Sequence, residues 1–509
     1  MRLGLMRRTT RSQGSGSSES TGSSAAAARR ASFALLLSCA IVGSCGGTTL
    51  PTASPTLAPA SQLAPSPAIS SVPPQPSLAA SPSALETPSA TPSASVTVGP
   101  DGIALIRSDA PLIPESAGAA RDAARAINSF GVDLYRRLSA GSGNIVISPA
   151  SVAIALDMAR AGAQGETAVQ MDAVLRATGS ADAQATAIGS LDQALAAQNG
   201  TFQDLMGNDL PVALRIANAP FAQIGMTIAP AYLDALATRF GAPLRLVDYA
   251  TDPNAARLLI NAWVKAQTEG RIPDLLAPPD VSTLTRLVLV NAIYLHAPWL
   301  LPFDAKLTAP GTFTRADASH VEVPMMTTHA FWPYAVGNGW KAVELPYLGG
   351  SLALDVILPD DLASFEAHLS NAELTRITGA LKPGPLELTL PRFHIQTEVR
   401  LADTLKALGM PLAFDQQRAD FSGIALPPCT DTPNCLFIAQ VIHQANIDVD
   451  EKGTTAAAAT AVVMGTGGPG YQGPWITVRL DRPFLFVLRD TKTGATLFMG
   501  RVADPSTKG

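Results

Sequence analysis

The residue types that perform covalent or metal chemistry are present in this sequence, but their spacing matches no catalytic pattern. From about residue 116 onward the chain contains neither a Gly-x-Ser-x-Gly nucleophile motif nor a His-Glu-x-x-His zinc motif. The six His residues are scattered without the spacing of metal ligands. His443 ends the apolar run 437–443, and a lone His in such a strand is usually a hydrogen-bonded structural residue. The sequence therefore predicts no enzyme, no metal site and no cofactor.

The N-terminal segment has the pattern of an export signal. Two Arg residues precede an apolar run over residues 31–42, which is too short to span a bilayer and suits a signal core. The following Ser44 and Cys45 resemble a bacterial lipobox, in which the Cys is lipidated and becomes the new N-terminus. We therefore expect residues 1–45 to be a lipoprotein signal peptide with Cys45 as the lipidation site. An ordinary cleaved signal is the alternative, and the long n-region leaves the start codon open.

Two further Cys residues, Cys429 and Cys435, lie close together in the chain. Metal-binding pairs usually have tighter spacing, and no His flanks these two. In an exported protein we expect a local disulfide between them, with a reduced pair as the alternative.

Composition divides the rest of the chain into a linker and a folded domain. Pro, Ser, Ala and Thr dominate residues 48 to about 115, and large apolar side chains are sparse there, so we expect residues 46–115 to be a disordered linker. Residues 116–507 form the expected domain. The formal net charge of −5 and the absence of a basic stripe make nucleic acid a poor partner.

The expected domain alternates helical and strand patterns, which indicates a mixed α+β fold. Apolar residues recur at helical spacing over 119–138, and further helices are expected over 151–160 and 400–408. The continuous apolar run 287–295 is typical of a strand in a sheet covered on both faces. Other strands are expected over the following ranges: 352–358, 386–390, 484–488 and 496–499.

A segment near the C-terminus has an unusual composition. Small and β-branched residues over 453–464 are followed by a Gly- and Pro-rich run over 465–474, with no charge between Lys452 and Arg479. The simplest interpretation is a flexible surface loop. The alternative is a segment that enters an existing sheet, since its alternate residues would face one way in a strand without steric conflict.

Short motifs in their order along residues 120–505 resemble the serpin family. The hinge that precedes the small-residue run resembles the hinge of inhibitory serpins. The other matching segments are 144–149, 162–167, 260–264, 268–272, 291–294, 299–303, 390–393, 408–410, 419–424, 481–484 and 497–502. The resemblance implies three β-sheets, about nine helices, an exposed reactive-centre loop and a metastable fold.

The resemblance also implies an activity and its site residues. A serine protease, or a cysteine protease, would attack the loop and form an acyl-enzyme, and the cut loop would enter the central sheet and distort the protease. The hinge residues that it implies are Glu451, Gly453, Thr454, Ala456, Ala457, Ala458, Ala459 and Thr460. The polar cluster that it implies at the point where the sheet parts is Ser148, Ser151, Asn291 and His443.

Two counts place the scissile bond at different positions. Counting from Gly453 at the family's spacing places it between Gly467 and Gly468, whereas counting back from Pro483 points near Tyr471 or Gln472. A fixed hinge length favours the first count, because slack would release the protease. No Lys or Arg lies in the loop, so we expect an elastase-like, subtilisin-like or chymotrypsin-like target.

Partners and location follow from the same resemblance. We expect a monomer that forms a covalent complex with its protease, either secreted or anchored at the cell surface by lipid alone. The region 172–215 lacks a Lys/Arg cluster, so no glycosaminoglycan site is expected. The alternative function is that of a non-inhibitory serpin acting as a surface binding module, but no charged, bulky or Pro residue in 453–460 blocks insertion.

Overall fold

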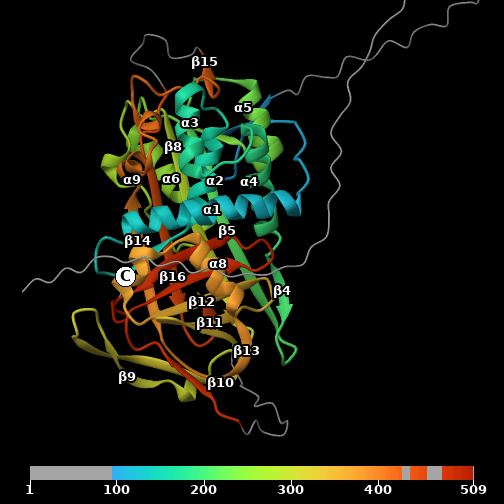
Figure 1. Cartoon of the computed structure of the whole chain (residues 1–509). Helices are drawn as coiled ribbons and strands as arrows, with labels where there is room; N and C mark the ends of the chain where they lie inside the picture. The colour runs from blue at the N-terminus through green and yellow to red at the C-terminus, as the bar shows by residue number, and fades with distance from the viewer. Residues whose placement is uncertain (1–93, 427–435, 455–472, 508–509) are drawn as a thin grey trace, which may run out of the picture. The chain divides into compact units, whose positions relative to one another are not determined.

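The computed structural model describes residues 94–426, 436–454 and 473–507. Helices and two large sheets make up this part of the chain (Figure 1), which confirms the mixed α+β class. Its nine α-helices are α1 (Ala117–Leu138), α2 (Pro149–Arg160), α3 (Gly165–Leu175), α4 (Ala181–Ala196), α5 (Pro230–Ala235), α6 (Pro253–Gln267), α7 (Leu362–His368), α8 (Asn371–Ala380) and α9 (Ala402–Leu408). None of the helices in these ranges is long and apolar enough to cross a membrane.

The first sheet has nine strands, and β8 lies near its middle. In spatial order the strands are β1 (Ala94–Val98), β2 (Ala104–Ser108), β7 (Leu244–Val247), β5 (Asp209–Gln223), β8 (Leu287–Pro298), β17 (Gly453–Thr454), β16 (Val441–Val449) and β14 (Phe393–Arg400), with β4 (Gly200–Gln203) beside β5. All of β8 is buried. Leu289 and Ile293 belong to the same core cluster as α2, whereas Val288 and Val290 pack in a second cluster with Trp263 of α6. Burial on both faces explains the uninterrupted apolar sequence of β8.

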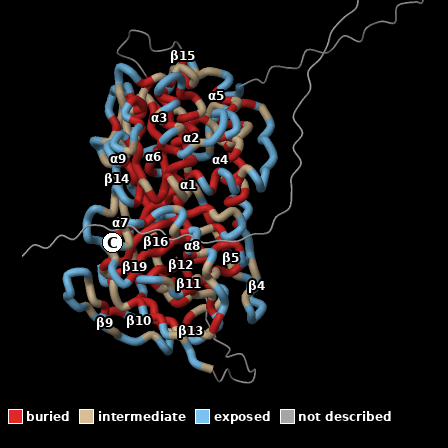
Figure 2. Tube along the Cα trace, in the orientation of Figure 1, coloured by how far each residue is buried: buried red, intermediate tan, exposed pale blue. Residues whose placement is uncertain are grey.

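The second sheet also has nine strands, and a short pair forms a third. In spatial order the second sheet contains β18 (Ile476–Arg479), β13 (Lys382–Pro391), β10 (His320–Gly337), β11 (Trp340–Pro346), β12 (Leu352–Pro359), β19 (Phe484–Asp490), β20 (Thr496–Val502) and β3 (Ile145–Ile147), with β9 (Ala309–Thr314) beside β10. The pair consists of β6 (Thr227–Ile228) and β15 (Ala425–Leu426). Figure 2 shows the burial concentrated along the sheets, with exposed residues on the outer turns.

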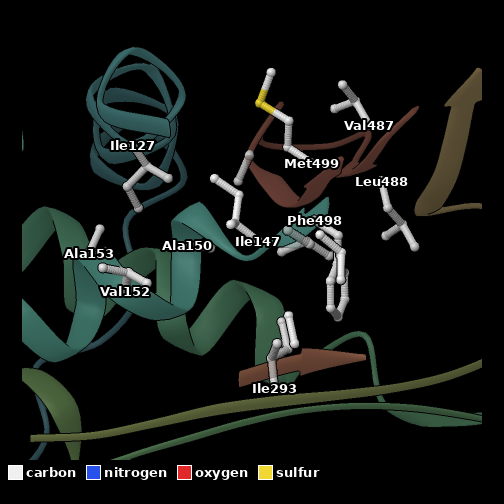
Figure 3. Close-up of a cluster of buried hydrophobic side chains, with 14 of the residues drawn as sticks. Ile127, Ile147, Ala150, Val152, Ala153, Ile293, Val487, Leu488, Phe498 and Met499 are labelled. Carbon is white, nitrogen blue, oxygen red and sulfur yellow. The ribbon is translucent and has the colours of Figure 1, made fainter. Parts of the chain in front are cut away.

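Helices α1 and α2 close the core over the second sheet. Figure 3 shows Ile127 of α1 and Val152 of α2 in the same cluster as Phe498 and Met499 of β20. Ile293 of β8 joins this cluster, so the two sheets share one core. This packing holds α2 against the second sheet. The N-terminus of α2 carries two residues of the site described below.

Two bounds predicted from the sequence are wrong: the C-terminal end of the disordered linker and the first residue of the strand before His443. Residues 94–108 lie within the expected disordered linker, but they form β1 and β2, and β2 pairs with β7. Their composition explains the difference, because Ile103 is fully buried and Leu105 packs against the same cluster. The strand expected over 437–443 begins only at Val441, since the Ile438 amide donates to the Ala413 carbonyl instead of to a strand.

Candidate functional site: the seam between two central strands

Strands β8 and β16 meet along a seam whose two ends differ. At one end they pair directly and in parallel, residues 289–293 with residues 441–445, and Asn291 lies opposite His443. At the other end β17 stands between them, pairing antiparallel with both. The seam is therefore closed at the first end and already parted by a third strand at the second.

The four polar residues expected from the sequence lie together at the closed end. The His443 Nε2 atom accepts a hydrogen bond from the Ser148 amide at 2.9 Å, and His443 Nδ1 lies 2.5 Å from Asn291 Oδ1. Asn291 Nδ2 donates to Ser151 Oγ at 2.7 Å. All four residues are buried. Each polar group thus has a partner inside the core, as burial requires.

This arrangement fixes the protonation state of His443. Because Nε2 accepts from a backbone amide, the ring proton belongs on Nδ1, from where it donates to Asn291. Burial lowers the pKa of His443 to about 3, so the ring is neutral at physiological pH. A second proton on Nε2 would face the Ser148 amide and remove this hydrogen bond.

Local sequence holds the two serines in place. Ser148 is the N-cap of α2, Pro149 occupies the first helical turn, and the Ser151 amide donates to Ser148 Oγ at 3.3 Å. Helix α2 therefore presents both residues to the seam.

A fifth residue, Asn218 of β5, belongs to the same network and was missed from the sequence. Its Oδ1 accepts from Ser151 Oγ and from Asn291 Nδ2, both at 3.0 Å, and its Nδ2 donates to the Ser151 carbonyl. The available signal was a single Asn in the apolar run 216–222. A lone polar residue there indicates a buried hydrogen bond but not its partner.

At the open end, the hinge residues Gly453 and Thr454 form β17. Gly453 pairs with Pro298 and Thr454 with Ala297 on one side, while Thr454 pairs with Val449 on the other. A Cβ on Gly453 would lie 2.2 Å from the Ala297 carbonyl oxygen, so only glycine fits here. The Thr454 side chain is buried, and its hydroxyl lies 2.5 Å from the Tyr347 hydroxyl.

A set of side chains anchors the residues just before β17. Glu451 Oε1 accepts from Arg392 Nη2 at 2.5 Å and from Thr308 Oγ1 at 2.5 Å. Burial by itself would raise the pKa of Glu451, but these hydrogen bonds outweigh it and hold the pKa below its ordinary value. Trp299 Nε1 donates to the Asp450 carbonyl at 2.9 Å.

Tyr347 completes the hinge contacts, and no motif or spacing in the sequence points to it. Its ring stacks on Trp299 with centroids 4.4 Å apart. Tyr347, Thr308 and Arg392 are each far from the hinge in sequence, and only the fold brings them to it. The remaining expected residues, Ala456, Ala457, Ala458, Ala459, Thr460, Gly467, Gly468, Cys45, Cys429 and Cys435, lie outside the described residues.

Comparison with known proteins identifies the class to which this fold and seam belong. Residues 125–505 match the family model described as Serpin (serine protease inhibitor). An uncharacterized serpin-like protein of Thermococcus kodakarensis is 35% identical over 390 residues, which cover 76% of this chain and 87% of that protein. The leukocyte elastase inhibitor of Bos taurus is 34% identical over 389 residues, covering 74% and 97%. The native crystal structure of the thermophilic serpin tengpin matches with a TM-score of 0.66 and 25% identity, covering 77% and 97%.

This chain therefore belongs to the serpin family. Serpins are protease inhibitors and not enzymes, and inhibitors are named among the relatives. The absence of a catalytic motif, noted from the sequence, is in keeping with this membership.

Proposed function

We propose that this serpin inhibits a serine protease by a single-use mechanism in which its cleaved loop enters the seam between β8 and β16. One observation carries the proposal: β17 already pairs with both strands at the open end of the seam. A strand that extended β17 would have the backbone donors and acceptors of β8 on one side and those of β16 on the other, once residues 289–293 and 441–445 part from each other.

The register gives the proposal a specific end point. Thr454 pairs with Ala297 and with Val449, so each further residue would pair one position earlier on both neighbours. Six residues on, Thr460 would stand between Asn291 and His443, which now pair with each other. Insertion would thus break the Asn291–His443 contact, and the polar cluster would act as the gate that the sequence suggested.

The protease would be trapped while it is still attached to the inserted strand. The acyl bond forms when the protease nucleophile attacks the loop, and hydrolysis must wait for its triad and oxyanion hole to be in place. Drawing the attached protease along the sheet would displace these groups, and about 1 Å of misplacement can cost roughly 100-fold in rate. We propose Gly467–Gly468 as the scissile bond.

The experiment is a titration against subtilisin, pancreatic elastase, chymotrypsin and trypsin. We expect complexes that survive SDS with one or more of the first three proteases and none with trypsin, and mass spectrometry of the released fragment should locate the cut. Cleavage in the loop should also raise the melting temperature sharply. Simple digestion with an unchanged melting curve would contradict trapping and favour a surface binding module.

We further propose export and lipid anchoring through Cys45, with a local disulfide between Cys429 and Cys435. The signal-like run before Cys45 supports the first part. Replacing Cys45 with Ser should release the protein from membranes into the medium, and equal membrane retention would contradict the anchor. An alkylation shift after reduction would report the disulfide.

A further inference from the structure

Asp157 carries a carboxyl group that is buried in α2 without a partner. The residue is 1% exposed, and neither of its carboxyl oxygens forms a hydrogen bond with any residue that the structure describes. An unpaired charge in a protein core is costly, so burial favours the protonated form of such a group. Burial raises the pKa of Asp157 to about 7. The group therefore changes its charge within the physiological range of pH.

Three charged groups act on this carboxyl group. Arg160 of α2 lowers its pKa, Asp172 of α3 raises it, and Arg239 lowers it. The Arg160 guanidinium is already engaged, because its Nε and Nη2 atoms donate to the two Asp172 oxygens at 2.6 and 2.7 Å. Among the described residues, the other elements packed against α2, which are α1, α4, β5, β8 and β20, add no charge that shifts the pKa of Asp157. Arg239 is thus the cation that can still respond when Asp157 ionises.

Arg239 lies in a short π-helical turn, η1 (Leu236–Phe240), that directly follows α5. Its Nη2 atom pairs with Asp182 of α4 at 2.7 Å, and the Asp182 side chain is 84% exposed. Its Nε atom is buried and has no hydrogen-bond partner in the described part of the chain. Arg239 therefore has one nitrogen paired at the surface and one unpaired donor in the interior, where Asp157 has unpaired acceptors.

The backbone of Arg239 is fixed against α4. A Cβ on Gly189 of α4 would lie 2.0 Å from the Arg239 carbonyl oxygen, so the absence of a side chain on this glycine lets η1 touch the helix. Figure 1 shows α2, α4 and α5 in the same region of the fold, and α4 packs against both α2 and η1. With its backbone held in this way, Arg239 can change partner by a rotation of its side chain, without a movement of η1.

We infer that Arg239 is a pH-dependent latch, which pairs with Asp182 while Asp157 is neutral and turns to Asp157 when that carboxyl group ionises. Leaving a buried charge unpaired costs more than losing an exposed ion pair, so the ionised Asp157 attracts Arg239 away from Asp182. The latch is separate from the proposed function and acts whether or not the loop traps a protease.

The latch joins two segments that lead into the first sheet. Helix α4 leads through β4 into β5, whereas η1 leads into β7, and residues 221–223 of β5 pair with residues 245–247 of β7. Below pH 7 the pair of Arg239 with Asp182 holds the first turn of α4 to η1. Above pH 7 that turn is released, so the contact between these two segments loosens as the medium becomes alkaline.

Hydrogen exchange in the full chain at pH 6 and pH 8.5 tests the latch. The Gln184 amide reports on the first turn of α4, because it donates to the Ser180 carbonyl at 3.0 Å. After correction for the intrinsic exchange rate at each pH, we expect the protection of Gln184 to fall about threefold at pH 8.5, as for the loss of an exposed ion pair. The Asp157→Asn variant cannot ionise at this position and should keep its protection at both pH values.

The Leu374 amide is the matched control, because it donates to the Ser370 carbonyl at 3.0 Å in the first turn of α8. There Arg376 pairs with Glu373, and hydrogen bonds from Arg376 hold the pKa of Glu373 below its ordinary value. Both charges of this pair persist at pH 6 and at pH 8.5, so the protection of Leu374 should stay constant.

The Asp182→Asn variant gives a second measurement without a substitution in the core. Because Asp182 is exposed, this variant should fold, and its Gln184 amide should be equally protected at both pH values. Constant protection of Gln184 in the wild type, or an equal fall in either variant, would overturn the inference. A fall of protection in α3 in place of α4 would also overturn it, because Arg160 would then have left Asp172 to pair with Asp157.

Discussion

The closed and open ends of the seam satisfy the same backbone groups in different ways. At the closed end, β8 and β16 bond to each other, and the half-buried Asn218 of β5 and the buried Ser151 of α2 border the contact. At the open end, both strands bond to β17, which is held by the contact of Thr454 with Tyr347 and, just before β17, by the hydrogen bond from Arg392 to Glu451. The ladder at the closed end is parallel and those at the open end are antiparallel, and the closed end also carries the network of Ser151, Asn218, Asn291 and His443. We propose that this network keeps the sheet shut at the closed end, and the predictions below test that role.

The largest effect should come from a charge at the open end. We expect Thr454→Arg to convert the inhibitor into a substrate, because an arginine at this buried position would cost several kcal/mol, about 3–5, and would displace β17, from which insertion would start. The stoichiometry of inhibition, measured by titration, should rise more than about tenfold.

Thr454→Ser is the matched control, because it keeps the hydroxyl that faces Tyr347 and should inhibit almost normally. Covalent complexes of Thr454→Arg at wild-type stoichiometry would mean that β17 does not lead the insertion.

The second prediction concerns Asn291, the residue at the centre of the polar network at the closed end. Asn291→Ala takes partners from His443, Ser151 and Asn218 at once. His443 Nδ1 loses its only partner among the described residues, whereas Ser151 and Asn218 keep their bonds to each other. An unsatisfied buried group costs about 1–3 kcal/mol, so the free energy of unfolding should fall by about 1–3 kcal/mol. Differential scanning calorimetry should show a lower melting temperature for the uncleaved protein.

Asn254→Ala provides the comparison, since Asn254 is exposed on α6 and accepts only a local hydrogen bond from Arg257 among the contacts that the structure gives it. Equal melting curves for Asn291→Ala and the wild type would show that the network contributes little to closure.

The third prediction concerns the stability of the fold at low pH. The folded-state pKa of His443 is about 3 and its ordinary value is 6.5, so the unfolded chain binds the extra proton between these two values. The stability contributed by neutral His443 is therefore lost as pH falls below about 6.5, by about 2 kcal/mol at pH 5. We expect the closed end to weaken first, with faster spontaneous loss of inhibition at pH 5.

Two buried carboxyl groups change the stability with pH in the direction opposite to that of His443. The contribution of His443 must therefore be measured as the difference between wild type and a His443 variant. Burial raises the pKa of Asp157 and of Asp355 to about 7, so the fold takes up their protons and gains stability as pH falls below 7. Melting curves of wild type and His443→Gln from pH 7.5 to 4 should therefore be subtracted. A difference that does not vary with pH would contradict the assignment of this slope to His443.

Local sequence patterns predicted α1, α2, α9 and the strands β8, β12 and β19. Apolar residues at helical spacing indicated α1, and a continuous apolar run indicated β8. The family motifs supplied Ser148, Ser151, Asn291 and His443, which the fold then brings together. Asn218 and Tyr347 could not be selected in this way, since Asn218 bonds to Ser151 across 67 residues and Tyr347 to Thr454 across 107. Local patterns show that a polar residue needs a partner, whereas only tertiary packing chooses it.

The smallest effect should come from Tyr347→Phe, which tests only the contact between the Tyr347 hydroxyl and Thr454 of β17. The variant keeps the ring that stacks on Trp299 and removes the hydroxyl that faces Thr454. One hydrogen bond is worth about 1 kcal/mol, so the hinge should leave the seam roughly fivefold more often. Hydrogen exchange at the Thr454 amide should accelerate by that factor, while exchange at the His443 amide stays unchanged.

The opposite outcome would be equally informative about the seam. If exchange at His443 accelerated together with exchange at Thr454, the two ends would open as one cooperative unit. The cluster could then not be a separate gate, because release of β17 by itself would part β8 from β16. Unequal exchange requires that the side chains around Asn291 hold their end independently, which is the condition for a sheet that waits for cleavage.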